Sequence, residues 1–259
     1  MTRFAPIFVS HGSPMLALDP GESGRFWAAL AAALPRPDAV LCVSAHTMTK
    51  APLVGSSPAP ETIHDFYGFP APLYEQRYKT PGAPALARRA ADLLQQAGIP
   101  CAIDPELGLD HGAWVPLRSM YPAGIPVAPV AVQPYLDAAW HCRVGRALAP
   151  LCDEGVLVIG TGGAVHNLRA LDRDERMGAP AWAQKFDDWL AATLASGDEA
   201  EFLDWQKRAP DARMAHPTQE HFLPIFVAYG AAGPGARGTR IHQGFTLGSM
   251  SMAAFRFAA

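Results

Sequence analysis

Residues 39–46 read AVLCVSAH, a run of small and apolar side chains that ends at a histidine. Two other stretches follow the same plan. PIFVS (residues 6–10) is followed directly by His11, and VLVIG (residues 156–160) leads through a glycine-rich turn to His166. A short apolar run without polar alternation is typical of a strand that is buried on both faces. These stretches predict three buried strands, each with a histidine just beyond it or at its end.

The rest of the chain alternates between short apolar runs and segments with helical spacing. Residues 100–104 and 127–133 predict two more strands, and the tail over 241–257 predicts another two that join near 248–251. Good helix formers at helical spacing predict four helices, over residues 23–34, 84–97, 138–151 and 181–195. This alternation predicts an α/β fold, with a largely parallel or mixed central sheet covered by helices on both faces.

The composition indicates a folded and mildly acidic protein. The 259 residues are 49% hydrophobic and 17% charged, with a formal net charge of −3. These proportions are those of a globular core and not of a disordered chain. The small net charge provides no electrostatic reason to expect nucleic acid or an anionic membrane as a partner. Because no repeat, low-complexity tract or linker divides the sequence, we expect residues 1–259 to form a single domain.

The N-terminal residues and the cysteines indicate the compartment. The first apolar run is short and is interrupted at Ser10–Pro14, so it does not match a signal peptide. No stretch approaches the ~18 apolar residues that a membrane-spanning helix needs. The four cysteines have no C-x-x-C spacing and predict neither a disulfide framework nor a cysteine metal site. We therefore expect a cytoplasmic protein.

The positions of the nine histidines carry most of the functional information. In open parallel sheets, ligands bind outside the carboxyl ends of the strands, where His11, His46 and His166 are predicted to lie. A single histidine after a strand is more often a hydrogen-bonded turn residue than a ligand, but three in equivalent places favour a shared site. Since imidazole is the commonest side-chain ligand for zinc, iron, copper and nickel, we expect a metal site of three or four histidines.

Two more histidines are candidates for this site. His111 lies in GLDHGAW, which we expect to be a loop. His221 lies in HPTQEHFLP, where Pro217 and Thr218 indicate the entry to a helix over Phe222–Ala231. His216 precedes His221 by five residues, which is about 140° around a helix, so one helix face cannot present both. Only one of the pair is expected to bind metal, unless the segment is not helical.

The remaining histidines have weaker claims. His141 lies within a predicted helix and is expected to be structural, and His242 lies in a strand that looks exposed. Other catalytic patterns are missing from the sequence, which has no G-x-S-x-G elbow, no P-loop and no H-E-x-x-H. The stretch GTGGAVHN has glycines after a strand but does not match G-x-G-x-x-G, so dinucleotide binding is not predicted.

Together these motifs resemble a known family, the extradiol ring-opening dioxygenases of the 4,5-DOPA type, which belong to the superfamily of protocatechuate 4,5-dioxygenase. The resemblance extends in order from about Pro6 to Met252. Each motif alone is weak, but seven in sequence are specific. They are VSHGSPM, SAHT, TIHDFYGFP, LDHGAW, the segment ending in VHNLR, HPTQEHFLP and the terminal LGSMSM.

The resemblance implies a role for each of five histidines. His11, His46 and His221 match the family's metal ligands, and His166 matches a residue that serves as the catalytic base or as a fourth ligand. His111 matches a pocket histidine that contacts dioxygen or substrate. The implied cofactor is Fe(II), and the implied substrates are a small aromatic diol, such as DOPA or another catechol, and dioxygen. No feature of the sequence indicates an oligomeric state.

One departure affects the metal. Non-haem iron oxygenases usually hold Fe(II) with two histidines and one carboxylate, whereas His221 stands here where the wider superfamily has Glu. Glu220 is adjacent, but neighbours on a helix point about 100° apart, so Glu220 could replace His221 and hardly join it. A site made of histidines alone also suits Zn²⁺, which has no redox chemistry, so a purified sample could carry zinc.

The substrate-binding residues are expected in TIHDFYGFP, where Phe66 and Tyr67, with Phe69, could line an apolar slot for the ring. His64 and Asp65 could shape that loop or contact the amino-acid end of the substrate. Two alternatives stay open. A zinc hydrolase could use the same histidines without oxygen, and the superfamily also includes cell-motility mediator proteins that serve as adaptors without catalysis.

Overall fold

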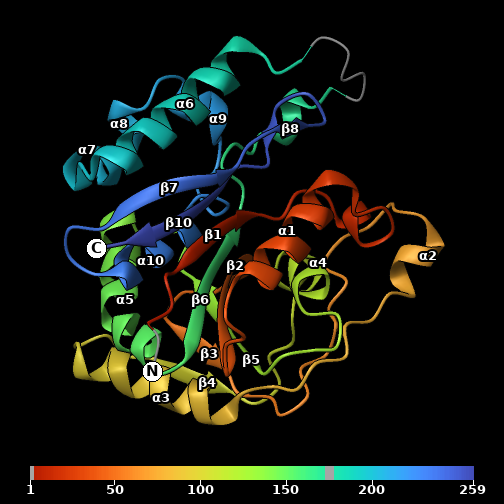
Figure 1. The fold of residues 1–259 in the computed structure, drawn as a ribbon, viewed down its shortest axis with the longest axis vertical. Helices are drawn as coiled ribbons and strands as arrows, with labels where there is room; N and C mark the ends of the chain where they lie inside the picture. The colour runs from red at the N-terminus through yellow and green to blue at the C-terminus, as the bar shows by residue number, and fades with distance from the viewer. Residues whose placement is uncertain (1–2, 173–177) are drawn as a thin grey trace.

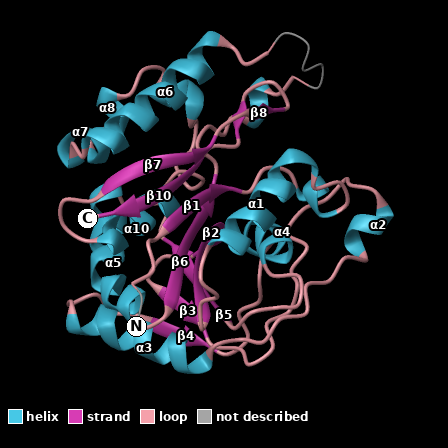
Figure 2. Cartoon of the chain, viewed as in Figure 1, coloured by secondary structure: helices cyan, strands magenta, loops and turns pink. Residues whose placement is uncertain are grey.

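A mixed eight-stranded sheet forms the centre of the computed structural model, which describes residues 3–172 and 178–259 (Figures 1 and 2). The strand order is β4-β3-β5-β2-β6-β1-β10-β7. The strands are β1 (Ile7–Ser10), β2 (Ala39–Met48), β3 (Leu53–Gly55), β4 (Ala102–Asp104), β5 (Val127–Val132), β6 (Val156–Gly162), β7 (Arg237–His242) and β10 (Ala254–Ala258). A separate small hairpin joins β8 (Phe245–Thr246) to β9 (Met250–Ser251).

The four inner strands β5, β2, β6 and β1 are parallel, and antiparallel neighbours flank them. On one side β10 runs antiparallel to β1, and on the other β3 pairs antiparallel with β5. The predicted α/β class and the largely parallel, mixed sheet are therefore confirmed. The carboxyl ends of β2, β6 and β1 lie side by side, because these strands are adjacent in the sheet.

Helices cover both faces of the sheet (Figure 1). The helices of ten residues or more are α1 (Gly21–Ala33), α3 (Pro84–Gln96), α4 (His111–Met120), α5 (Ala138–Leu148), α6 (Ala181–Ser196) and α10 (Leu223–Ala232). Shorter helical turns are η1 (Pro14–Ala17), α2 (Ala71–Tyr74), η2 (Ala149–Asp153), η3 (Leu168–Ala170), α7 (Glu199–Leu203), α8 (Trp205–Arg208) and α9 (Ala212–Ala215).

Alternation along the inner strands builds two separate cores. In β2, Val40 and Cys42 face the core beneath α1 and α4, while Leu41 and Val43 face the core beneath α3, α5, α6 and α10. Complete burial of one such side chain stabilises the fold by roughly 1.5–3 kcal/mol. Since a slip of one residue would exchange the two faces, packing on both sides fixes the register and with it the position of His46.

The strands and helices predicted from the apolar runs are all present, with small shifts at their ends. The helix expected over 138–151 ends at Leu148, and a 3₁₀ turn with a proline in its first positions continues to Asp153. The tail predicted as two strands over 241–257 instead contains the end of β7, the β8–β9 hairpin and most of β10, and β9 lies where the join was expected. The turn of this hairpin contains Leu247 and Gly248, both with left-handed backbone angles.

Several elements were missed, among them β3 and α4. The strand β3 is only three residues long, and α4 stands where a loop was expected around His111. Pro116 inside α4 interrupts the helical pattern, although Asp110 before it is a typical helix cap and was the available signal. Within the described residues, we find no helix with the length and apolarity to cross a membrane.

His141 is structural, as expected from its place in a helix. Its Nδ1–H donates to the Asp137 carbonyl at 2.8 Å, and its Nε2 accepts from the Gln133 N–H at 3.1 Å. In its neutral form the ring therefore makes a hydrogen bond at each nitrogen. Burial lowers the pKa of His141 to about 4. Between the unfolded pKa of about 6.5 and pH 4, the folded state therefore binds fewer protons than the unfolded chain. The free energy of unfolding decreases as the pH is lowered through that window.

A His141→Gln variant should show a weaker pH dependence of stability. The ring's contribution is fully present above about pH 6.5, and on the order of 2 kcal/mol of it is lost by pH 5. Urea unfolding at pH 7 and pH 5, with a chelator in every sample, measures this difference. The variant should lose about 2 kcal/mol less than the wild type on acidification. Equal losses in the two proteins would show that His141 does not titrate as described.

Candidate metal centre

Two parallel strands deliver the first two histidines to one edge of the sheet. His11 is the first residue after β1, and His46 lies in the last part of β2, beyond a register shift in its pairing with β5. The Nε2 atoms of the two rings are 3.1 Å apart. The strand-end position predicted for this pair is therefore confirmed.

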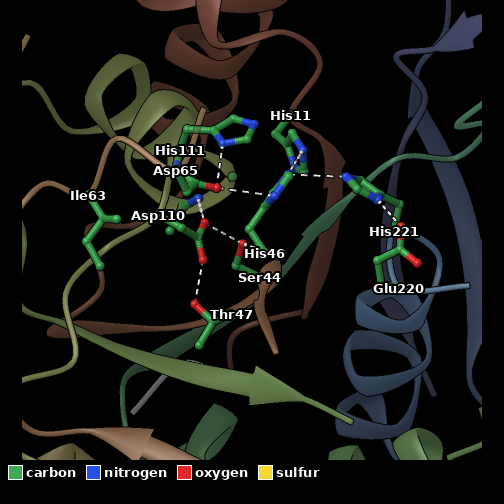
Figure 3. A network of polar contacts seen from close by, with 12 residues as sticks. His11, Ser44, His46, Thr47, Ile63, Asp65, Asp110, His111, Glu220 and His221 are labelled. Atoms are coloured by element: carbon green, nitrogen blue, oxygen red, sulfur yellow. Dashed lines mark hydrogen bonds and ion pairs between the residues drawn. The ribbon is translucent and has the colours of Figure 1, made fainter. Parts of the chain in front are cut away.

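His221 completes a cluster of three imidazole rings. It lies in the turn before α10, and its Nε2 is 3.2 Å from Nε2 of His46 (Figure 3). Potential ligand atoms of His11, His46 and His221 all lie within 4.8 Å of one another. Three segments that are distant in sequence thus meet at one point, and all three rings present the same nitrogen to it.

Glycines at the end of β6 allow His221 to reach this position. A Cβ atom on Gly162 would lie only 2.0 Å from the carbonyl oxygen of His221, and the Gly163 N–H donates to that same carbonyl at 2.9 Å. The glycine-rich turn GTGG therefore serves close backbone packing, which agrees with its poor match to a dinucleotide-binding motif.

Each of the three rings has a hydrogen-bond acceptor at its other nitrogen. Nδ1 of His46 faces Asp65 at 3.2 Å, and Nδ1 of His221 faces Glu220 at 3.0 Å. Nδ1 of His11 faces the Thr161 hydroxyl at 3.1 Å; that hydroxyl donates its own proton to the carbonyl of Gly112, so its oxygen accepts from the ring. The hydrogen bonds of His11 and His221 place hydrogen on Nδ1 and a lone pair on Nε2, and a carboxylate oxygen lies beside Nδ1 of His46.

This arrangement fits a metal ion. Lone pairs that face each other at 3.1–3.2 Å repel unless a cation lies between them. Metal–nitrogen distances of about 2.0–2.1 Å place neighbouring ligand atoms roughly 2.9–3.4 Å apart, which includes the observed separations. Acceptors behind ligating histidines, which fix the tautomer and the ring direction, are a regular feature of metal sites.

The surroundings also keep these rings neutral, which is the form that binds metal. Burial, followed by repulsion among the neighbouring histidines, lowers the pKa of His11 and His221 well below the ordinary value. Burial lowers the pKa of His46 to about 4, with repulsion from His111 as the next cause.

Asp110 is a buried carboxylate that sequence reasoning did not single out as a site residue. Its Oδ1 accepts from the Ser44 hydroxyl at 2.6 Å and from the Ala113 N–H at 3.1 Å, while Oδ2 accepts from the Thr47 hydroxyl. Ser44 and Thr47 lie on either side of His46. Asp110 therefore caps α4 and, at the same time, fixes the irregular part of β2 that carries a candidate ligand.

His111 lies beside the cluster at the start of α4. Its ring centroid is 4.0 Å from that of His46 and 5.2 Å from that of His11. Asp65 accepts from its ring Nδ1 at 2.9 Å and from its backbone N–H at 2.8 Å. Burial opposes ionisation of Asp65, but the hydrogen bonds from His111 outweigh it and hold the pKa of this carboxyl below its usual value.

His166 is close to the cluster but is not one of its three converging members. Its ring stacks on His221 with centroids 3.4 Å apart, and its potential ligand atom groups with those of Glu220 and His221. Burial, followed by repulsion from His216, lowers its pKa to about 3. Of the four histidines predicted as metal ligands, His11, His46 and His221 converge on one point, and His166 stacks on the ring of His221.

The terminal LGSMSM motif helps to hold the loop that carries His166. Ser251 pairs with Val165 in an isolated antiparallel bridge, and the Ser249 hydroxyl donates to the carbonyl of Ala170 at 2.9 Å. From the other side, the backbone N–H of His166 donates to the carbonyl of Ala215 at 3.0 Å. The loop is therefore fixed between the β8–β9 hairpin and the end of α9.

The helical geometry assumed for Glu220 was wrong, because the segment before α10 is a turn. In this turn Glu220 hydrogen-bonds Nδ1 of the adjacent His221 and so supports that ring. The helix predicted over 222–231 is present as α10, which starts at Leu223 with Pro224 in its first turn. His216 points elsewhere, with Nε2 donating to the carbonyl of Ala164 at 3.0 Å.

The residues expected to bind substrate separate into two groups. The ring centroid of Phe66 lies 5.7 Å from that of His111 and 5.6 Å from that of His64. Through Phe66 the TIHDFYGFP loop therefore packs against the histidine cluster. His64 also hydrogen-bonds the carbonyl of Gln76 at 3.0 Å. Tyr67 is 91% exposed and lines no apolar slot in this structure. His242 stacks on Phe26 instead of joining the cluster.

The fold and the site together define a class: an α/β protein with a histidine cluster that could hold a metal ion at the carboxyl ends of its parallel strands. The model of a protein family, the catalytic LigB subunit of aromatic ring-opening dioxygenases, matches residues 6–257, and the chain belongs to this family. It is therefore an extradiol ring-cleaving dioxygenase, as the motifs predicted. The family implies a metal ion, with an aromatic diol and dioxygen as substrates.

Individual relatives agree with this assignment. The chain is 43% identical to a 4,5-DOPA dioxygenase extradiol of Beta vulgaris, over 97% of this chain and 96% of the relative. It is 39% identical to a 4,5-DOPA dioxygenase extradiol of Escherichia coli (strain K12), over 97% and 93%. The crystal structure of an uncharacterized protein from Escherichia coli K12 matches with a TM-score of 0.82 and 33% identity, over 98% of this chain and 99% of that one.

Replacing Gly162 with Ala should weaken metal binding. The added Cβ atom would lie 2.0 Å from the carbonyl oxygen of His221, so the segment that carries this candidate ligand has to move. We expect at least ~10-fold weaker binding of Zn²⁺, measured by competition with a chelator, and a loss of stability on the order of 1–3 kcal/mol.

Gly145→Ala is the matched control. Its Cβ atom would meet the carbonyl oxygen of Val227 at 2.1 Å, an equally close contact that lies in the packing of α5 against α10. It should lower stability by a similar amount and change the metal affinity by less than about threefold. Equal metal affinity in Gly162→Ala and the wild type would contradict this role of the glycine.

Proposed function

We propose that His11, His46 and His221 hold Fe(II) and that the chain opens the ring of a DOPA-like catechol with dioxygen. The observation that carries the proposal is the convergence of three Nε2 lone pairs, each set by an acceptor behind the ring. Three protein ligands leave coordination positions for small molecules, as in other non-haem iron oxygenases. The same donor set would bind Zn²⁺, so zinc is the expected contaminant of a purified sample.

A bound metal ion would supply Lewis-acid polarisation of the diol and a common binding point for diol and dioxygen. The side chains around it would handle protons. His166 is proposed as the base that takes a proton from a diol hydroxyl. A carboxylate oxygen of Glu220 lies within 4.8 Å of a ring nitrogen of His166, and would stabilise the imidazolium that forms.

His111 is proposed to hydrogen-bond dioxygen or the substrate. Its ring adjoins those of His11 and His46, and Asp65 holds it through two hydrogen bonds. Phe66 adjoins His111 and would contact the aromatic ring of the substrate, with His64 behind it. Tyr67 would take part only if substrate draws its exposed ring toward the site. The substrate class follows from the relatives named 4,5-DOPA dioxygenase extradiol.

We further propose that residues 1–259 form one catalytic domain in the cytoplasm. The family match over residues 6–257 supports the single domain. All four cysteines are free thiols, three of them buried, which supports a reducing compartment.

Oxygen uptake by the Fe(II)-loaded protein tests this function. The protein is stripped with a chelator, loaded anaerobically with Fe(II), and mixed with a panel of catechols that includes DOPA. We expect oxygen consumption and a ring-opened product in equal amounts, with no turnover when Zn²⁺ replaces Fe(II). Activity with Zn²⁺ under anaerobic conditions would indicate a hydrolase instead. No turnover of any catechol by fully loaded protein would favour a scaffold without catalysis.

Replacing His166 with Ala should stop turnover while leaving metal binding largely intact. The ring is stacked on His221 and is not one of the three converging ligands. We expect kcat to fall by about 10²–10⁴-fold, the usual contribution of a positioned base, with metal affinity within about tenfold of the wild type. Full activity would remove His166 from the role of base, and loss of the metal ion would make it a fourth ligand.

A further inference from the structure

We propose that Asp65 is a positioning residue that sets the ring direction of two histidines with different tasks, the ligand His46 and the pocket residue His111. The inference rests on the proposed function only in assigning those two tasks. It predicts that one carboxylate controls both metal affinity and the rate of turnover.

The contacts of Asp65 are shared between the two rings. Its Oδ2 lies 2.9 Å from Nδ1 of His111 and 3.2 Å from Nδ1 of His46, and its Oδ1 accepts the backbone N–H of His111 at 2.8 Å. Figure 3 shows the carboxylate between the two rings. The side chain is 21% exposed, so water competes with these hydrogen bonds only in part.

No other acceptor replaces it among the residues that the structure describes. The remaining ring contacts of His46 are made by Nε2, toward His11 and His221, and the hydrogen bonds of the His111 ring go to Asp65 alone. Asp110 fixes the backbone on either side of His46 but does not contact its ring. Among the described residues Asp65 is therefore the one acceptor that lies beside Nδ1 of both rings.

A carboxylate suits this place because two N–H groups of His111 donate to it and Nδ1 of His46 lies 3.2 Å from Oδ2. An amide has one oxygen and one NH₂, so in either orientation the NH₂ of Asn faces at least one of these donors. If it faces the rings, the conflict is relieved when the hydrogen moves from Nδ1 to Nε2. That shift would remove the lone pair with which His46 binds metal, and would turn the free nitrogen of His111 from an acceptor into a donor.

Thr161 provides the contrast. Among the described residues, its hydroxyl hydrogen-bonds the ring of the ligand His11, 3.1 Å from Nδ1, and the carbonyl of Gly112, but not the ring of His111. Thr161→Val keeps the shape and removes the acceptor. It should weaken metal binding without a direct effect on a step that uses His111.

The experiment compares Asp65→Asn with Thr161→Val, His111→Ala and the double variant Asp65→Asn/His111→Ala. Asp104→Asn is the neutral control, because this carboxylate ends the edge strand β4 and accepts a hydrogen bond from the Glu106 N–H. Zn²⁺ affinity is measured by chelator competition, kcat at saturating Fe(II) by oxygen uptake, and histidine tautomers in the metal-free protein by ¹⁵N NMR. Thermal melting confirms folding, and Asp65→Ala serves if the Asn variant does not fold.

We expect Asp65→Asn to weaken Zn²⁺ binding about 10–100-fold and to lower kcat at saturating metal at least ~10-fold. Thr161→Val should also weaken Zn²⁺ binding, but it should leave Nδ1–H on the ring of His111, which distinguishes it from Asp65→Asn. Because Asp65 acts on turnover through His111, the double variant should have the kcat of His111→Ala within about twofold. The NMR spectra should show Nδ1–H on both rings in the wild type and its loss in Asp65→Asn.

Three results would overturn the proposal: unchanged metal affinity in Asp65→Asn, unchanged kcat at metal saturation, or a double variant whose loss is the product of the single losses. The proposed function can fail separately. If the wild type cleaves no catechol, the affinities and the tautomers still decide whether Asp65 positions His46 and His111.

Discussion

The structure of the site depends on one constraint: three imidazole rings converge, with Nε2 of His46 lying 3.1 Å from Nε2 of His11 and 3.2 Å from Nε2 of His221. Burying polar ring nitrogens costs free energy unless each of them has a partner. The cluster persists because packing fixes the backbone of each segment and because an acceptor lies beside the outer nitrogen of each ring. A metal ion at the centre would give the three Nε2 atoms a common partner.

Much of the protein serves to hold these three segments in place. The register of β2 between two apolar cores fixes His46, the parallel pairing of β1 with β6 fixes His11, and the bare backbone of Gly162 lets His221 approach. The acceptors come from elements outside the strands. Asp65 lies in a long loop and Glu220 in the turn before α10, so each ligand is oriented by a different part of the fold.

The strands and the histidines could be predicted from the sequence because their signals are local. Apolar runs reveal buried strands, and a histidine just beyond such a run lies at the edge where parallel sheets bind ligands. The supporting contacts could not be predicted in the same way. Asp65 and His111 meet across 46 residues, and Ser44 and Asp110 across 66, through tertiary packing with no periodic signature. Glu220 was misjudged because helical geometry was assumed for a segment that Pro224 and the packing on Gly162 leave as a turn.

Metal stoichiometry in single-histidine variants tests the central claim most directly. His11→Ala, His46→Ala and His221→Ala are loaded anaerobically with Fe(II), freed of excess ion and assayed for iron, with His242→Ala as the control because its ring stacks on Phe26 away from the cluster. We predict about one ion per chain in the wild type and control, and at most about a tenth as much in each of the three variants. A full complement of iron in any of the three would contradict the trihistidine site.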